Sequence, residues 1–105
     1  MGSESGASRP KAEPTVQFDD AELRVTLWSF APGAETGWHR HDHDYLVVPL
    51  SDGELLLETP DGPVRAGLST GGSYRRPSGV EHNVVNANAF PFRFVEVEFK
   101  KPNGA

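Results

Sequence analysis

The chain contains no cysteine among its 105 residues. This excludes disulfide bonds, thiolate metal ligands and a cysteine nucleophile, so any metal must be held by nitrogen or oxygen atoms. Basic residues are scarce as well: 10 lysines and arginines stand against 15 aspartates and glutamates, and the net charge is −5. Because a nucleic-acid-binding protein normally carries a basic surface, no nucleic-acid partner is expected.

Long apolar segments are also missing, both the length that spans a membrane and the shorter core of a signal peptide. We therefore expect a soluble, cytoplasmic protein without a membrane partner. The chain length predicts a single domain. Residues 1–14, rich in Ser, Gly and Pro, are predicted to form a flexible N-terminal tail, and residues 15–101 are predicted to form the domain.

No segment combines a helical apolar period with a capped helix start. Short segments with the alternating pattern of strands recur instead, and turns rich in Gly and Pro separate them. The predicted strands cover residues 21–30, 36–41, 45–50, 54–59, 64–68, 72–76, 81–86 and 91–100. Many short strands between such turns predict an all-β sandwich or barrel.

Three of the four histidines lie in two of these strands. His39 and His41 are two residues apart, so on a strand they point to the same face. His82 follows 41 residues after His41, on another predicted strand. Converging imidazoles can hold a metal ion, and we predict His39, His41 and His82 as its ligands. The alternative is a metal-free pocket in which the three rings are hydrogen-bonded polar residues.

The segments around these histidines resemble the two motifs of the cupin superfamily, specifically its small single-domain conserved-barrel (cupin 2) members. The second family motif, G-x5-P-x-G-x2-H-x3-N, is met in full by Gly71, Pro77, Gly79, His82 and Asn86. Shorter stretches within residues 36–45 and 79–83 are similar to small cupins of bacterial β-alanine degradation. That second resemblance indicates a pathway and does not supply a reaction.

The first family motif, G-x5-H-x-H-x3,4-E-x6-G, is met only in part. Gly33, His39 and His41 stand in their places, but Tyr45, or Leu46 at the longer spacing, replaces the metal-binding glutamate. The resemblance implies an RmlC-like jelly-roll barrel of two antiparallel sheets, one divalent metal per chain and a homodimer. The metal is expected to be Fe, Ni, Mn or Zn, since ligand type alone does not choose among them.

The missing glutamate has a chemical consequence. Three neutral imidazoles carry no charge, so the metal keeps its full charge and should prefer an anionic, chelating ligand. This expectation fails if Asp44 or Glu81 is a fourth ligand. The hydroxyl of Tyr45 is a candidate catalytic donor to a bound ligand, and the alternative is that Tyr45 only lines the barrel. His43, between two aspartates, is expected to be a solvated turn residue.

Two functions from different classes fit these residues. The first is a metal-dependent enzyme, such as an oxygenase-like catabolic enzyme, that acts on a small carboxylate or carbonyl compound. The second is a non-catalytic barrel that binds a metal or a small molecule. The open three-histidine site favours the enzyme, whereas the missing glutamate and the lack of an acid/base pair favour the binding protein. Arg75 or Arg76 could pair with a substrate carboxylate, although strand arginines more often face solvent.

Overall fold

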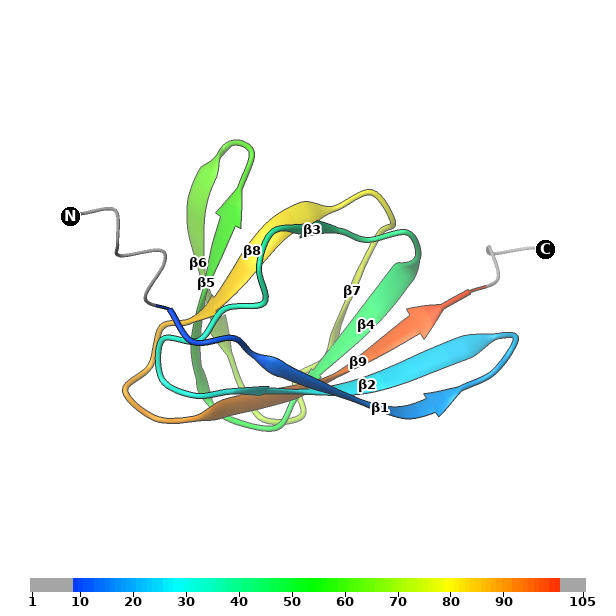
Figure 1. Cartoon of the computed structure of the whole chain (residues 1–105), viewed down its shortest axis with the longest axis horizontal. Coiled ribbons are helices and arrows are strands. Elements are labelled where there is room, and N and C mark those ends of the chain that lie inside the picture. The colour runs from blue at the N-terminus through cyan, green and yellow to red at the C-terminus, as the bar shows by residue number, and fades with distance from the viewer. Residues whose placement is uncertain (1–8, 101–105) are drawn as a thin grey trace.

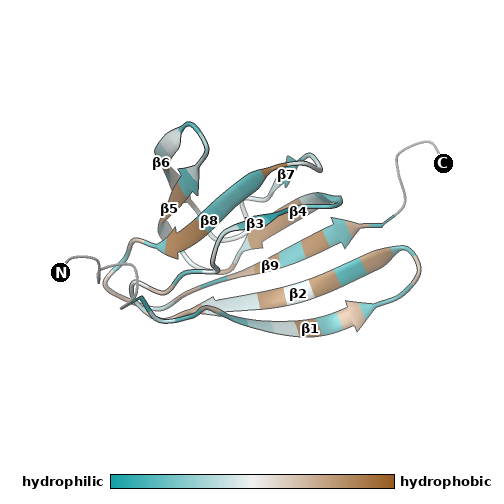
Figure 2. Ribbon diagram, turned by 45° about the horizontal axis from the view of Figure 1, so that its top comes forward, coloured by the Kyte–Doolittle hydropathy of each residue, from teal (hydrophilic) through white to brown (hydrophobic). Residues whose placement is uncertain are grey.

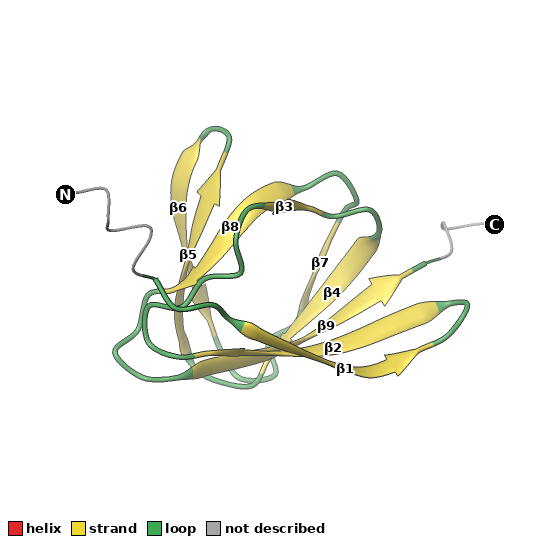
Figure 3. Ribbon diagram, viewed as in Figure 1, coloured by secondary structure: helices red, strands yellow, loops and turns green. Residues whose placement is uncertain are grey.

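The structure is a computed structural model that describes residues 9–100. Strands and loops make up this part of the chain, and it contains no helix that could cross a membrane (Figure 3). The strands are β1 (Glu13–Asp19), β2 (Leu23–Phe30), β3 (His39–Arg40), β4 (Asp44–Pro49), β5 (Gly53–Thr59), β6 (Gly62–Leu68), β7 (Tyr74–Arg76), β8 (Glu81–Asn86) and β9 (Phe92–Phe99). The all-β class predicted from the sequence is confirmed.

The strands form two antiparallel sheets that face each other (Figure 1). The five-stranded sheet has the order β1-β2-β9-β4-β7, and the four-stranded sheet has the order β3-β8-β5-β6. Sequential strands therefore alternate between the sheets along much of the chain, which is the connectivity of a jelly roll. Inward-facing aromatic residues fill the space at one end, where Phe30 and Phe92 are fully buried and the rings of Phe30 and Phe94 lie 5.4 Å apart.

The five-stranded sheet carries apolar side chains on its outer face as well as on its inner face, whereas a sheet that covers a core commonly has one apolar and one polar face. On β9 the inner face carries Phe92, Phe94, Glu96 and Glu98, and on β2 it carries Thr26 and Trp28. The residues opposite, which we call the outer apolar face, are Leu23, Val25 and Leu27 of β2, Leu46 and Val48 of β4, and Val95, Val97 and Phe99 of β9. Strands β2, β9 and β4 are neighbours in the sheet (Figure 2), so the face is continuous. All eight side chains are partly exposed.

Residues 9–14, which the sequence analysis assigned to the tail, lie against the barrel. Arg9 pairs with Glu35 and Glu58 at 3.1 Å each, and Ala12 is buried with its amide bonded to the carbonyl of Glu35. Strand β1 starts at Glu13 and forms an edge of the five-stranded sheet. Every residue of this strand is exposed. Residues 1–8 lie outside the described residues, so the tail prediction is not tested there.

Candidate metal centre

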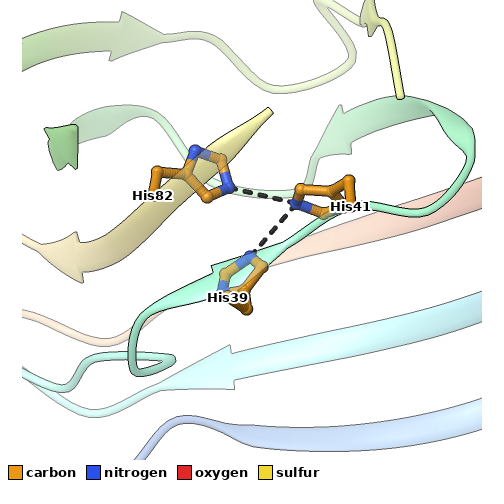
Figure 4. Close-up of side chains that lie close together, drawn as sticks. All are labelled: His39, His41 and His82. Atoms are coloured by element: carbon orange, nitrogen blue, oxygen red, sulfur yellow. Dashed lines mark hydrogen bonds between the residues drawn. The ribbon is translucent and has the colours of Figure 1, made fainter. Parts of the chain in front are cut away.

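The three histidines predicted as ligands come together between the sheets (Figure 4). His39 and His82 are direct cross-strand partners on β3 and β8, and His41 follows β3 immediately. The Nε2 atom of His41 lies 3.1 Å from Nε2 of His39 and 3.1 Å from Nε2 of His82. All three rings therefore present the same nitrogen to one point.

This arrangement fits a metal ion. Two nitrogens bonded to one metal at about 2.0–2.1 Å are separated by about 2.9–3.3 Å, from octahedral to tetrahedral angles. Nε2 of His41 is 3.1 Å from each of the other two Nε2 atoms, which falls within that interval, and all three ligand atoms lie within 4.8 Å of one another. With lone pairs on all three Nε2 atoms, the cluster is a set of metal ligands. With Nε2 of His41 protonated, the same contacts are N–H···N hydrogen bonds, which is the metal-free alternative given above.

His39 is oriented by the loop before it. Its Nδ1 donates to the carbonyl of Gly37 at 2.8 Å, which leaves the lone pair of the neutral ring on Nε2. Gly37 has a φ of +92°, a conformation that favours glycine and that turns its carbonyl toward the ring. The amide of Gly37 donates to Oδ1 of Asn83 at 2.8 Å, and the Asn83 amide donates to Glu35 and Glu58. A buried asparagine thus holds the loop that positions His39.

His41 is held by an aromatic ring and faces a carboxylate. Tyr45 stacks on it with ring centroids 3.8 Å apart and an angle of 18°. Oε2 of Glu96 lies 3.9 Å from Nδ1 of His41, on the side of the ring away from the convergence point. Burial, with a smaller effect of His39, lowers the pKa of His41 to about 4, and the same causes lower the pKa of His82 to about 3. Both rings are therefore neutral ligands at neutral pH.

Glu96 is a functional candidate that the sequence analysis missed. It lies in the same cavity, is 9% exposed, and accepts a hydrogen bond from Nε1 of Trp28 at 3.3 Å. Burial raises the pKa of this carboxyl to about 7. The alternation of β9 places Glu96 on the same face as Phe94. The sequence alone does not say that this face, and not the face of Val95, Val97 and Phe99, turns inward.

Tyr45 occupies the position of the missing family glutamate and is 2% exposed. Burial raises the pKa of its phenol to about 12, so it is a neutral hydroxyl and a poor candidate for a phenolate ligand. Its ring supports His41, as described above. The catalytic role predicted for its hydroxyl stays a prediction.

The other candidate ligands lie apart from the cluster. Asp44 accepts from the amide of Ser78 at 2.8 Å and from Arg75 at 3.3 Å. Glu81 pairs with Arg40 at 3.6 Å near the surface. His43 is half-buried in the turn before β4 and is not one of the three clustered rings.

A cavity of about 600 Å³, counted to its open mouth, adjoins the three histidines. Its walls are mostly apolar and include Val47, Leu55, Leu57, Val84 and Phe94. A second, more open groove runs along the inner side of β1 and β2, past Val16 and Thr26, and also reaches His39, His41 and Glu96. The candidate centre therefore lies between a cavity and a groove.

Two facing antiparallel sheets with three inward-facing histidines define a jelly-roll barrel with a candidate metal site. The family model described as "Cupin domain" matches residues 26–98. The chain belongs to the cupin family, and the resemblance stated from its motifs is confirmed.

Three similar proteins each match about nine-tenths of this chain. "Beta-alanine degradation protein BauB" of Pseudomonas aeruginosa is 63% identical over 94 residues, which cover 90% of this chain and 99% of that protein. The crystal structure of a cupin domain from Bordetella pertussis Tohama I has 57% identity and a TM-score of 0.88, and covers 90% of this chain and 98% of that one. A Klebsiella pneumoniae protein with a double-stranded β-helix domain has 26% identity and a TM-score of 0.74, over 92% of this chain and 84% of that one.

Proposed function

We propose that the chain binds one divalent metal ion through His39, His41 and His82 and acts on a small anionic carboxylate or carbonyl compound. The convergence of three Nε2 atoms beside a cavity carries this proposal. The metal would supply Lewis-acid or oxygen-activating chemistry. The chain itself would exclude water with the apolar cavity walls and orient the ligands through Gly37 and Tyr45.

Glu96 supports the enzyme over the binding protein. The lack of an acid/base group weighed against catalysis in the sequence analysis, and this buried carboxyl supplies one. With a pKa raised to about 7 by burial, it can hold or release a proton near neutral pH. Its place in the cavity puts that proton within reach of a bound ligand.

The pathway follows from the relative's name. We propose that the chain takes part in β-alanine degradation, as the name of the 63% identical protein says of that protein. Transfer of the amino group of a β-amino acid to an acceptor oxo acid leaves an oxo carboxylate, which belongs to the anionic, chelating class expected at a metal without a carboxylate ligand. The reaction is proposed to be oxygenase-like.

The first test is the metal content of protein purified without a His-tag column, measured by mass spectrometry. We expect roughly one equivalent of iron, nickel, manganese or zinc per chain. His39→Ala and His82→Ala should lose the metal while the barrel still folds, because removal of either side chain leaves the backbone pairing of β3 with β8 unchanged. His43→Ala is the matched control and should keep it; loss of metal from this variant would place His43 in the ligand set and contradict the assignment.

The alternative is a non-catalytic barrel that binds a metal or a small molecule, and Tyr45 in place of the family glutamate favours it. Dioxygen uptake by iron-loaded protein over a panel of keto acids, diketones and thiols separates the two. Uptake with one class supports the oxygenase-like enzyme. No uptake across the panel by fully loaded protein would direct the search to a bound organic ligand.

We also propose a homodimer that buries the outer apolar face. A small domain gains from association because it hides little of its own surface. Continuous apolar surface of this kind marks an interaction site in a folded protein. Phe18 of β1 pairs with Val25 of that face, is about half exposed and lies on the open edge, so it extends the same face. The cytoplasmic location stays a prediction.

A further inference from the structure

Arg76 reaches the cavity beside the three histidines, and no ion pair joins it to a carboxylate within residues 9–100. It is the ladder partner of Tyr45, whose ring stacks on His41. Its neighbour Arg75 points to the opposite face of β7, where it pairs with Asp44 at 3.3 Å and lies 4.5 Å from the ring centre of Phe99. Two adjacent arginines therefore have different environments.

Arg76 brings a positive charge to the candidate centre, because it lines the same cavity as the three histidines. A guanidinium that lacks a carboxylate partner, next to a site for a divalent cation, makes this part of the cavity positive, and the single carboxyl of Glu96 offsets that charge only in part. Arginine binds carboxylates through paired, charge-assisted hydrogen bonds.

Apart from Glu96, Thr36 and the polar atoms of Trp28, Tyr45 and Tyr74, the remaining cavity surface is apolar. Leu55 is fully buried, and Val47 and Phe94 are nearly so, which leaves few polar atoms to hydrate a ligand on this side. A short, fully polar acid would contact the positive end and leave the apolar wall without a partner. A ligand with an apolar substituent would cover both parts.

We propose that Arg76 anchors the carboxylate of an amphipathic oxo acid, whose branched or aromatic substituent lies along the wall of Val47, Leu57 and Phe94. This inference rests on the proposed function for the contact of the oxo group with a metal at the three histidines. It names a larger acid than the one that β-alanine itself would leave, because that short acid would not cover the apolar wall. The anchor and the wall do not need the metal, and this makes them separately testable.

The test is calorimetric binding of pyruvate, α-ketoisocaproate and methyl isobutyl ketone to metal-loaded and to chelator-treated protein. A buried methylene improves affinity by about fourfold, so α-ketoisocaproate should bind at least about tenfold more tightly than pyruvate. The ketone, which lacks a carboxylate, should bind more weakly than α-ketoisocaproate. No binding of α-ketoisocaproate to either form, or equal affinity for the two acids, would overturn the inference.

Arg76→Gln should reduce the affinity for α-ketoisocaproate by about tenfold or more and leave that for the ketone unchanged, since only the charged contact is lost. Arg76→Lys should restore part of the affinity. Arg75→Gln, the matched control on the outer face, should bind as the wild type does. Arg75 and Arg76 are both exposed, so these variants should fold, and thermal unfolding should show a cooperative transition for each of them. Equal affinity of Arg76→Gln and wild type for α-ketoisocaproate would show that Arg76 does not bind the carboxylate.

The two proposals fail in distinguishable ways. If the wild type takes up no metal, but Arg76→Gln still loses α-ketoisocaproate in chelator-treated protein, the proposed function is wrong and the anchor is correct. If metal binds to the three histidines and the Arg76→Gln variant keeps full affinity for the acid, the anchor is wrong and the metal centre is unaffected.

Discussion

Glu96 combines a buried carboxyl with a position beside His41, and its protonation links stability to pH. Its pKa is raised to about 7 by burial, whereas an unfolded glutamate titrates near its usual value of about 4.5. Between these values the folded state holds a proton that the unfolded state releases. A rise in pH through this window therefore lowers the free energy of unfolding.

Glu96→Gln should remove this penalty. In metal-stripped protein the variant should gain stability over wild type as pH rises from about 4.5 to 7, with a slope of at most about 1.4 kcal/mol per pH unit, and the gain should level off above that range. Urea unfolding at a series of pH values measures it. Glu54→Gln, an exposed carboxylate that pairs with Arg65 on the other sheet, should bring no such gain. A difference in unfolding free energy between Glu96→Gln and wild type that does not change with pH would contradict the raised pKa of Glu96.

The two buried histidines, His41 and His82, have the opposite effect on the pH dependence of stability. The pKa of His41 is lowered to about 4 and that of His82 to about 3, so the unfolded chain takes up protons below pH 6.5 that the folded chain does not. Their contribution to stability is present above about pH 6.5 and is lost as the pH falls. Because both rings are already neutral at pH 7, metal uptake there needs no proton release from them.

At the scale of elements, the loop between β2 and β3 decides where His39 points. Asn83 is buried at 6% exposure, and it connects this loop to Glu35 and Glu58, which Arg9 also contacts. The hydrogen bonds cross from β8 to the N-terminal segment, so the ring orientation of one ligand depends on residues far apart in the sequence.

Asn83→Ala should weaken metal binding by about 10- to 100-fold, the range typical of residues that orient a ligand through hydrogen bonds. Competition with a chromogenic chelator measures the affinity, and the absorption spectrum of the cobalt-substituted protein reports the ligand geometry. Asn88→Ala is the control, since Asn88 bonds to Glu54 and Asn86 away from the loop. An unchanged cobalt spectrum and affinity in Asn83→Ala would leave Asn83 with a role in stability alone.

The strands and the three histidines could be predicted from the sequence because their signals are local: alternation, turn residues and two compact motifs. Asn86, at the end of the second motif, is also understood locally, since its side chain bonds to the carbonyls of Phe30, Ala31 and Phe90 at the barrel end. Glu96 and Asn83 could not be predicted. Their importance depends on which face of a strand turns inward, and here the more apolar face of β9 turns outward.

At the scale of the whole molecule, the outer apolar face is the strongest physical argument for self-association. Val25 lies opposite Val97, and Val97 lies opposite Leu46, so one apolar band crosses three strands. Water contact with such a band is unfavourable by about 25 cal/mol for each Å² left exposed. A second copy of the chain offers an identical surface, which suits a two-fold interface.

Val97→Glu should therefore shift the protein to a monomer in sedimentation equilibrium, because two charges would meet across the interface. The barrel and its metal should persist, since the side chain points away from the cavity. Val64→Glu places the same charge on an exposed site of β6 in the other sheet and should leave the dimer intact. A Val97→Glu protein with the mass of the wild-type assembly would exclude this face as the interface.

The cavity and the groove meet at His39, His41 and Glu96 and are otherwise lined by different residues, such as Val47 and Leu55 in the cavity and Pro14 and Val16 in the groove. A ligand that fills the cavity leaves the groove free as a second route, through which water or a small co-reactant can arrive and a small product can leave. Entry and exit then need not compete for one passage. Because Pro14 and Val16 of β1 line the groove, a partner chain seated over that strand would narrow this route, and the rate of exchange at the centre would depend on protein concentration.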